Sequence, residues 1–391
     1  MQDKIKKIGI DARFYGPFAK GLGRYTQEIV DNILKIDTEN NYVIFLGKHN
    51  FDELIIDKDN KRVKKVLVDI KWYSWKEQLL FPFYIWKEKL DLIHFTHFNV
   101  PIFCPVKFIV TIHDLILTKF KTVRATTKHP LIYSLKDFFY RVVIKSALKK
   151  SKKILTVSNF TKDDIVQQFK INPKKIQVIY EGVSNLSKGR DSLFVAKLNK
   201  EEVLSDYKIS FPYFLYVGNA YPHKNLEFLV ESFLKWNSKD NKFRLVMVGK
   251  EDFFYKRTKE YAFNLINKNN YNNSIIFTGY VPDDKLEIIY QRAMIYIFPS
   301  LYEGFGLPPL EALFNSCPVL SSREASMPEI IQNGALYFDP YDYEDFYNKL
   351  NLLVDNEKLR QNIIEQGKEV LKRYNWWECA YQTREAYFQS L

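Results

Sequence analysis

Two glutamates, separated by seven residues, flank a turn of glycine and proline in the stretch SLYEGFGLPPLEALF, residues 300–314. The two prolines can begin a helix, because early helical positions need no backbone donor. Glu303 is then predicted in the loop and Glu311 in the first helical turn, so the two carboxylates can reach different groups of one ligand. The alternative is that Glu311 complements the helix dipole and Glu303 points to water, which leaves the glycine-bracketed Phe305 unexplained.

A lysine follows a strand and a glycine turn in FLYVGNAYPHKNLEF. Lys224 is predicted at the start of a helix that opens near Asn225, where a cation opposes the helix dipole and is normally disfavoured. A diphosphate at this helix end would explain the lysine, which would supply a point charge while the amides of Lys224 and Asn225 add donors. The alternative is a solvated surface lysine.

Two loops in the first half could also face a ligand. In IDARFYGPFAKGLGRY, the amides of Gly21 and Gly23 could approach a phosphate at a helix N-terminus. The glycine spacing matches neither a P-loop nor a dinucleotide fingerprint, and an ordinary glycine turn is the alternative. In VTIHDLI, His113 and Asp114 end a strand at the edge where parallel sheets bind ligands. The alternative there is a hydrogen-bonded core histidine and a helix cap.

The elements that must carry these loops alternate short apolar runs with longer stretches of helical period, which is typical of parallel sheets covered by helices. We predict an α/β protein with two units, because 391 residues exceed one ordinary core. Strands are predicted at 7–12, 42–47, 64–69, 92–95, 108–112, 154–157 and 176–180, then at 213–218, 244–249, 275–279, 295–299, 319–321 and 336–338. Helices are predicted at 22–36, 75–88, 131–149 and 162–169 and from about Tyr343 onward. A linker is expected near 185–205, with a ligand crevice between the domains.

Charge and cysteine usage narrow the class of partner and the compartment. A net charge of +12 favours an anionic partner, but zinc fingers, RNP-type strands and arginine-rich tails are missing, so we expect no nucleic-acid partner. Cys104, Cys317 and Cys379 lack the spacing of a zinc site and are predicted as buried thiols. The start MQDKIKKIGIDARF lacks a secretory signal, and polar residues interrupt the apolar region 92–117, so we predict a cytoplasmic protein without a membrane span.

The motif EGFGLPPLE, with VGNAYPHKN about eighty positions before it, IHD earlier and a glycine-rich loop after the first strand, resembles the family 4 retaining glycosyltransferases of the GT-B fold. LTVSNFTKDDI and PEIIQNGALYFDP resemble further stretches of these enzymes. The resemblance implies two Rossmann-like domains whose parallel sheets face each other across a central cleft. Residues 1–195 would bind the acceptor and residues 196–370 the nucleotide sugar, while residues 371–391 would form a helix crossing back toward the N-terminal domain.

The resemblance also implies roles for individual residues. Catalytic roles fall to Lys224, Glu303 and His113, and substrate binding to Gly21, Gly23, Asp114, Asn219, Val281, Phe305, Gly306, Leu307 and Glu311. Glu311 would hydrogen-bond the ribose hydroxyls, Glu303 would approach the sugar hydroxyls and Lys224 would neutralise the leaving diphosphate. His113 would contact the transferred sugar. Amides of residues 305–307 would hold sugar and phosphate, the two glycines would face the diphosphate, and Val281 would lie near the base.

One position departs from the family pattern. Relatives often carry an arginine where this sequence has Asn219. Phosphate clamping would then shift to Arg13, Arg24 or His223.

The implied reaction retains the anomeric configuration by a front-face route and needs no cofactor or metal. The combined pattern TIHDLI, HFNVP and EGFGLPPLEA resembles mannosyltransferases that use GDP-mannose. UDP-glucose and UDP-N-acetylglucosamine enzymes share the core motifs, and a GT-B epimerase or a nucleotide-sugar binding protein stays an alternative. The acceptor would be a glycan or a lipid-linked oligosaccharide in cell-surface polysaccharide synthesis, including lipopolysaccharide.

Two stretches mix basic and aromatic residues: KWYSWKEQLLFPFYIWKEKL and KTVRATTKHPLIYSLKDFFYRVVIKSALKKSKK. One interpretation is that they rest on the anionic inner face of the cytoplasmic membrane as a peripheral contact. The alternative is that they form amphipathic helices whose aromatic side chains face the core.

Overall fold

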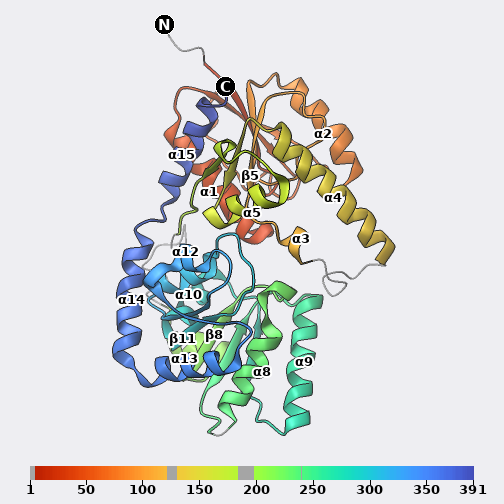
Figure 1. Ribbon diagram of the computed structural model, residues 1–391. Coiled ribbons are helices and arrows are strands. Elements are labelled where there is room, and N and C mark those ends of the chain that lie inside the picture. The colour runs from red at the N-terminus through yellow and green to blue at the C-terminus, as the bar shows by residue number, and fades with distance from the viewer. Residues whose placement is uncertain (1–4, 121–129, 184–197, 239) are drawn as a thin grey trace. The chain divides into compact units, whose positions relative to one another are not determined.

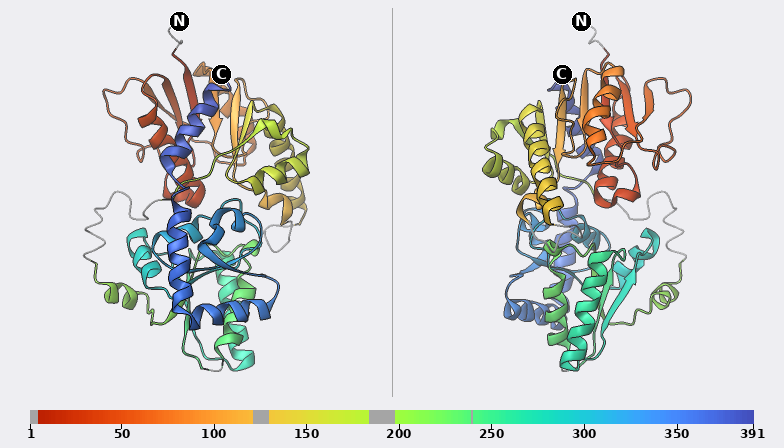
Figure 2. Two further views of the ribbon diagram at one scale, coloured as in Figure 1. Left: turned by 60° about the vertical axis from the view of Figure 1, so that its left-hand side comes forward. Right: turned by 90° about the vertical axis from the view of Figure 1, so that its right-hand side faces the viewer.

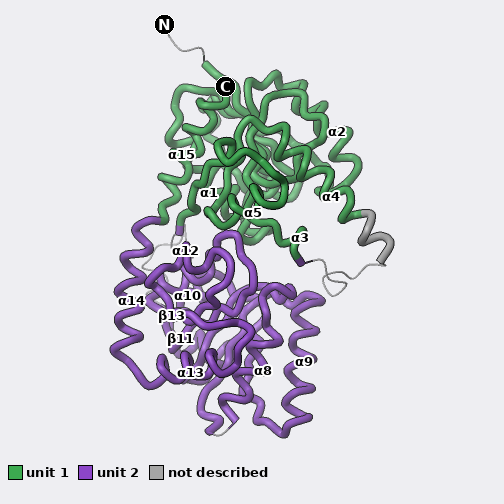
Figure 3. The backbone as a smooth tube through the Cα atoms, viewed as in Figure 1, with its two compact units in different colours: residues 1–119, 126–182, 374–391 green, residues 120–125, 183–373 purple. Residues whose placement is uncertain are grey.

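The computed structural model describes residues 5–120, 130–183, 198–238 and 240–391. The chain divides into two compact units (Figure 3). Unit 1 comprises residues 1–119, 126–182 and 374–391, and unit 2 comprises residues 120–125 and 183–373. The α/β class with two parallel sheets is confirmed.

Unit 1 is built on a seven-stranded parallel sheet of order β3-β2-β1-β4-β5-β6-β7. Its strands are β1 (Lys7–Asp11), β2 (Asn41–Leu46), β3 (Val63–Leu67), β4 (Leu92–Phe95), β5 (Phe108–Ile112), β6 (Lys153–Thr156) and β7 (Ile176–Val178). The central strands β4 and β5 are buried along their whole length because helices cover both faces of the sheet. In register, Ile10 of β1 lies beside Ile44 of β2 and His94 of β4.

The helices of unit 1 form two layers, one on each face of the sheet (Figure 1). One core contains side chains of α1 (Lys20–Ile36) and α15 (Trp376–Phe388). The other contains side chains of α2 (Trp75–Lys87), α4 (Pro130–Lys150) and α5 (Asn159–Phe169). Short elements complete the unit: η1 (Pro17–Ala19), α3 (Ile116–Lys119) and η3 (Pro173–Lys175).

Unit 2 repeats the plan with a six-stranded parallel sheet of order β10-β9-β8-β11-β12-β13. Its strands are β8 (Tyr213–Val217), β9 (Arg244–Val248), β10 (Ile275–Gly279), β11 (Ile295–Phe298), β12 (Val319–Ser322) and β13 (Ala335–Phe338). Its helical elements are α7 (Lys200–Asp206), η4 (Pro222–Lys224), α8 (Leu226–Asn237), α9 (Phe253–Asn269), α10 (Asp283–Arg292), α11 (Leu307–Phe314), α12 (Met327–Ile331), η5 (Gln332–Gly334), α13 (Tyr343–Asp355) and α14 (Glu357–Leu371). Among the helices that the structure describes, none is both long enough and apolar enough to span a membrane.

Among the differences from the sequence-based expectation, two segments have a local explanation. Most of the expected linker at 185–205 lies outside the described residues, but its last residues begin α7. The side chain of Asn199 caps α7 by accepting from the amides of Glu201 and Glu202, and an Asn cap favours helix even where no sustained period shows it. The four-residue helix α3 was also not predicted, because it is too short for a period to appear.

The C-terminal helix α15 packs into the core of unit 1 through Trp376, Ala380 and Tyr387. The ring of His94 on β4 lies between two hydroxyls, with Nδ1 2.8 Å from the Tyr387 hydroxyl and Nε2 2.8 Å from Thr111 Oγ1. Burial lowers the pKa of His94 to about 3, so the ring is neutral at pH 7. A buried neutral imidazole needs both bonds, and one of them comes from α15.

Replacing Tyr387 by Phe should therefore destabilise unit 1. The variant leaves one ring nitrogen of His94 unpaired in the core, which typically costs about 1–3 kcal/mol. Tyr381→Phe on the same helix is the control, because Tyr381 is 45% exposed. Urea unfolding should show a loss for Tyr387→Phe only, and equal stabilities of the two variants would refute this role of His94.

Candidate functional site of unit 2 and the strand ends of unit 1

The loop after β11 carries Glu303, and its shape depends on a left-handed backbone conformation at Gly306. Gly306 has φ of +92° and precedes the first residue of α11. A Cβ on this residue would lie 2.5 Å from Met327 Cε, so a larger residue would be strained for two reasons. The hydroxyl of Ser326 donates to the carbonyl of Glu303 at 2.9 Å and also reaches that of Phe305 at 3.4 Å. The loop is thus fixed before any ligand arrives.

Glu311 does not lie in the first turn of α11, as the sequence suggested. The helix begins at Leu307, so Glu311 is its fifth residue, and the first turn contains no acidic side chain. The cause is that the helix starts one residue before the prolines. The carboxylate of Glu311 is buried and accepts from the Tyr290 hydroxyl at 3.4 Å. Burial and the charge of Glu311 raise the pKa of Tyr290 well above its usual value, so the phenol stays a donor.

Lys224 and Glu303 form an ion pair inside unit 2. Their side chains are 9% and 12% exposed, and Lys224 Nζ also lies 5.4 Å from the centre of the Phe298 ring. The sequence predicted a role for each residue but gave no sign that they contact each other. Within the described part of the chain, this lysine in the turn after β8 has one carboxylate partner and a small exposed fraction, so it is suited to exchange that partner for another anion.

His223 does not add positive charge to this site at neutral pH. Burial, followed by the charge of Lys224, lowers its pKa to about 4. The carbonyl of His223 accepts from the amide of Leu301 at 2.8 Å, which joins η4 to the loop that carries Glu303. At pH 7 His223 would therefore contribute to phosphate clamping as a neutral hydrogen-bond donor, and this role stays a prediction.

The amides of Lys224 and Asn225 are not open donors, contrary to the expectation. Pro222 starts a 3₁₀ turn in which the amide of Lys224 donates to Tyr221 at 2.8 Å and the amide of Asn225 to Pro222 at 3.2 Å. Helix α8 begins only at Leu226, because Asn225 adopts a left-handed conformation. Of the three donors predicted for a diphosphate here, the lysine side chain is the one that remains.

Of the other predicted residues of unit 2, Asn219 and Val281 follow strand ends, whereas Phe305 lies in the loop after β11 and Leu307 begins α11. The side chain of Asn219, after β8, accepts from the amide of Tyr221 at 3.3 Å, and its carbonyl accepts from the Tyr216 hydroxyl at 2.7 Å. Val281 follows β10 and is 3% exposed. Phe305 is buried and Leu307 is half-buried. Their roles toward a ligand stay predictions.

His113, in unit 1, has a partner for each ring nitrogen. Nδ1 lies 3.1 Å from Glu181 Oε1 and Nε2 lies 3.0 Å from the carbonyl oxygen of Thr96. A carbonyl only accepts, so Nε2 carries a proton, and an ionised Glu181 requires a second proton on Nδ1. Burial alone would lower the pKa of His113, but the hydrogen bond and charge of Glu181 outweigh it and raise this pKa. The two partners favour the protonated ring, which could bind a sugar hydroxyl only by exchanging one of these partners.

Glu181 is the functional candidate that the sequence analysis missed. It lies three residues after β7, in the stretch YEGV, at the same edge of the sheet as His113. The signal that could have found it is its position after a predicted strand, since acidic residues at strand ends face those of neighbouring strands. The 68-residue separation from His113 hides the pair in the sequence.

Asp114 and the glycines of the first loop have local structural roles. The carboxylate of Asp114 accepts from the amide of Ile116 at 3.0 Å, which supports the helix-cap alternative. A Cβ on Gly23 would lie 2.0 Å from the carbonyl oxygen of Gly16, so only a residue without a side chain fits beside this carbonyl. Gly21 is exposed in the first turn of α1, and a Cβ placed on it would meet no other atom within 4 Å. Any contact of these residues with a diphosphate stays a prediction.

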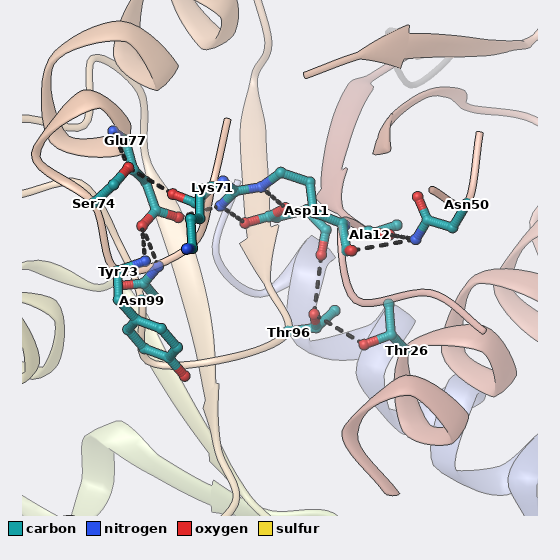
Figure 4. A network of polar contacts seen from close by, with 11 residues as sticks. Asp11, Ala12, Thr26, Asn50, Lys71, Tyr73, Ser74, Glu77, Thr96 and Asn99 are labelled. Atoms are coloured by element: carbon teal, nitrogen blue, oxygen red, sulfur yellow. Dashed lines mark hydrogen bonds and ion pairs between the residues drawn. The ribbon is translucent and has the colours of Figure 1, made fainter. Parts of the chain in front are cut away.

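Arg13 belongs to a network of buried charges (Figure 4), and its contact with a phosphate stays a prediction. Its guanidinium is 1% exposed and lies 2.7 Å from both Asp11 Oδ2 and Glu77 Oε1. The other oxygen of Glu77 accepts from the Tyr73 amide at 2.9 Å and from the side chain of Asn99. The network fastens the start of α2 to the end of β1, and Nη1 of Arg13 is buried without a hydrogen-bond partner among the described residues.

Among the described residues, no group of histidine, cysteine and acidic side chains is arranged to hold a metal ion. The three cysteines are free thiols; Cys317 and Cys379 are buried and Cys104 is half-buried.

The fold and these strand-end sites define the class of the protein. Sucrose-phosphate synthase (tll1590) from Thermosynechococcus elongatus superimposes with a TM-score of 0.74 over 98% of both chains, at 17% identity, and so shares the fold. This is the GT-B fold of glycosyltransferases. The chain belongs to the family 4 glycosyltransferases: the models "Glycosyltransferase Family 4" and "Glycosyl transferases group 1" match residues 46–185 and 199–370.

Two curated relatives share a more specific name. The O-antigen chain mannosyltransferase RfbU of Salmonella typhimurium (strain LT2) is 28% identical over 279 residues, which are 70% of this chain and 69% of that protein. The O-antigen chain mannosyltransferase B of Escherichia coli is 27% identical over 246 residues, 62% of each chain and thus less than two thirds of its length. The protein is therefore a mannosyltransferase-like member of the family.

The pairing of His113 with Glu181 predicts a pH-dependent contribution to stability. A histidine whose folded pKa is raised stabilises the fold below its unfolded pKa of about 6.5 and loses this contribution as the pH rises through the folded value. Glu181→Gln should lower the pKa of His113, measured by NMR titration of its ring proton. The stability lost in this variant should be larger near pH 6 than near pH 9. Glu378→Gln, an exposed carboxylate, is the control, and an unchanged His113 titration in Glu181→Gln would contradict the pairing.

The Lys224–Glu303 pair should behave as a buried pair in a mutant cycle. Lys224→Met leaves the Glu303 carboxylate without its partner and should cost up to about 3 kcal/mol of unfolding free energy. Adding Glu303→Gln should restore most of the loss. The control is Lys368→Met, which breaks an exposed 2.7 Å pair with Glu365 and should change stability by less than about 0.5 kcal/mol. Equal losses at the two lysines would refute burial of the first pair.

Proposed function

We propose that the protein is a retaining hexosyltransferase that moves mannose from GDP-mannose to a glycan or lipid-linked oligosaccharide acceptor in cell-surface polysaccharide synthesis. The observation that carries this proposal is the buried Lys224–Glu303 pair at the carboxyl end of the unit 2 sheet. The names of the two O-antigen relatives support mannose as the transferred sugar.

Donor binding would rearrange this pair. Lys224 would exchange Glu303 for the diphosphate, because two phosphate groups offer more negative charge than one carboxylate. Glu303 would then accept hydrogen bonds from hydroxyls of the sugar. Glu311, held by Tyr290, would accept from the ribose hydroxyls, and the amides of residues 305–307 would donate to sugar and phosphate oxygens.

The proposed reaction needs charge stabilisation more than a nucleophile. The acceptor oxygen forms a bond to the anomeric carbon on the face from which the diphosphate leaves, and the hydroxyl proton passes to a phosphate oxygen. Lys224 stabilises the charge that develops as the bond between carbon and the leaving oxygen breaks. The reaction is proposed to be metal-independent, because the lysine and the loop amides take this charge.

Unit 1 would contribute further contacts. His113 is proposed to contact the transferred sugar, and its charged form would add a second cation for the donor. Asp114 and the two glycines of the first loop would complete the donor contacts, as Asn219 and Val281 would in unit 2. An acceptor on a lipid anchor would bring the enzyme to the inner face of the cytoplasmic membrane.

The donor is tested by calorimetry with GDP-mannose, UDP-glucose and UDP-N-acetylglucosamine, followed by NMR of the products. GDP-mannose should bind at least tenfold more tightly than the others, and the product should keep the anomeric configuration of the donor. Lys224→Ala should lower kcat about a hundredfold or more. Glu311→Gln should mainly weaken donor binding, because a ribose contact is the same in ground and transition states.

Lys368→Ala, an exposed lysine of unit 2, is the control for these assays. Tighter binding of a UDP-sugar would overturn the choice of GDP-mannose. Conversion of the donor without an acceptor would indicate an epimerase, and binding without any conversion would indicate a nucleotide-sugar binding protein.

A further inference from the structure

Helix α2 exposes a stripe of large apolar side chains to solvent. Trp75, Leu79, Phe83 and Trp86 are 68%, 67%, 60% and 63% exposed. Their spacing of four, four and three residues places them along one side of the helix. The rings of Phe83 and Trp86 stack with centres 5.9 Å apart. These four residues are called the α2 stripe.

The α2 stripe is not the face with which the helix packs on the sheet. Phe81 and Ile85 of the same helix are fully buried in the core of unit 1. The hypothesis that the aromatic side chains of this segment face the core is therefore right for Phe81 and wrong for the stripe. A helix with apolar residues on both sides needs a second apolar environment.

Helix α4 also exposes apolar side chains. It lies beside α2 over the same face of the sheet, and both helices contribute side chains to one core (Figures 1 and 2). Phe138 and Phe139 are 61% and 56% exposed, and Val142 is 37% exposed. Single exposed apolar residues need no explanation, but a group of this size is unusual on a monomer.

The charges on these helices are mostly positive. Lys76 and Lys87 are exposed on α2, and Lys76 Nζ lies 5.8 Å from the Trp75 ring centre. The only acidic residue of α2, Glu77, is fully buried against Arg13. Residues 136–150 of α4 carry five basic side chains and one aspartate, and that aspartate pairs with Arg141 at 2.9 Å. The outer surface thus combines aromatic rings and cations with very little negative charge.

We infer that the α2 stripe and the exposed residues of α4 dock onto the surface of an anionic lipid bilayer. Tryptophan and phenylalanine insert at the level of the headgroups, and lysines beside them attract anionic lipids. A second copy of the chain docked through the same surface would place cations against these lysines, whereas an anionic bilayer leaves them among phosphates. The inference rests on the proposed function, because a lipid surface would present the lipid-linked acceptor to the enzyme.

The test is co-sedimentation of the full chain with vesicles. The wild type should bind vesicles that contain phosphatidylglycerol, bind phosphatidylcholine vesicles at least tenfold less tightly, and bind more weakly as salt rises. Phe83→Ser/Trp86→Ser should bind at least tenfold less tightly than wild type, because the inserted apolar area is lost. Lys76→Glu/Lys87→Glu should lose most of the preference for phosphatidylglycerol. Its affinity for these vesicles should fall about fivefold or more for each lysine replaced.

The matched control is Trp377→Ser/Tyr381→Ser on α15, which belongs to the layer on the other face of the sheet. Trp377 and Tyr381 are 50% and 45% exposed, and this variant should bind vesicles like the wild type.

Three results would overturn the inference. They are failure of the wild type to bind anionic vesicles, equal loss in the α2 and α15 variants, and a dimer without lipid that Phe83→Ser/Trp86→Ser dissociates. The last result would assign the surface to a second copy of the chain. Calorimetry of Phe83→Ser/Trp86→Ser with GDP-mannose should match the wild type, so failure of donor binding in the wild type is a separate outcome that concerns only the proposed function.

Discussion

A buried charge must have a partner, and this requirement organises the strand ends in both units of the protein. Lys224 pairs with Glu303, His113 with Glu181, and Arg13 with Asp11 and Glu77. Parallel sheets bring such side chains to one edge, so a charge there meets residues distant in sequence. These pairs neutralise the charged side chains when no ligand is bound.

The pairs differ in how far they can open, and this separates ligand sites from structural links. Arg13 is enclosed by two carboxylates at 1% exposure, so releasing it would leave buried charges without solvent or ligand to replace them. Among the described residues, Lys224 has one carboxylate partner, Glu303, and both side chains are about one tenth exposed. An incoming diphosphate can take the place of Glu303 at a small desolvation cost, because the lysine has already lost most of its water.

The local features were predictable from the sequence, and the long-range pairs were not. The strands and long helices follow from hydrophobic period, and the loop of Glu303 follows from Gly306 and the prolines, all within a few residues. Lys224 and Glu303 are 79 residues apart, so no local pattern shows that they meet. The errors have the same origin: the 3₁₀ turn that uses the Asn225 amide, and the exact first residue of α11, depend on backbone choices that residue types alone leave open.

One buried ion pair determines the character of both the inner and the outer side of helix α2. Its sequence is apolar almost all round, so period alone could not decide which side faces the core. The structure resolves this by burying Glu77 against Arg13, which commits that side inward and removes the only acid of the helix from its outer side. An outward Glu77 would place a negative charge beside the α2 stripe and leave Arg13 with one carboxylate. The same ion pair therefore fixes the inner packing of α2 and keeps its outer side cationic and apolar.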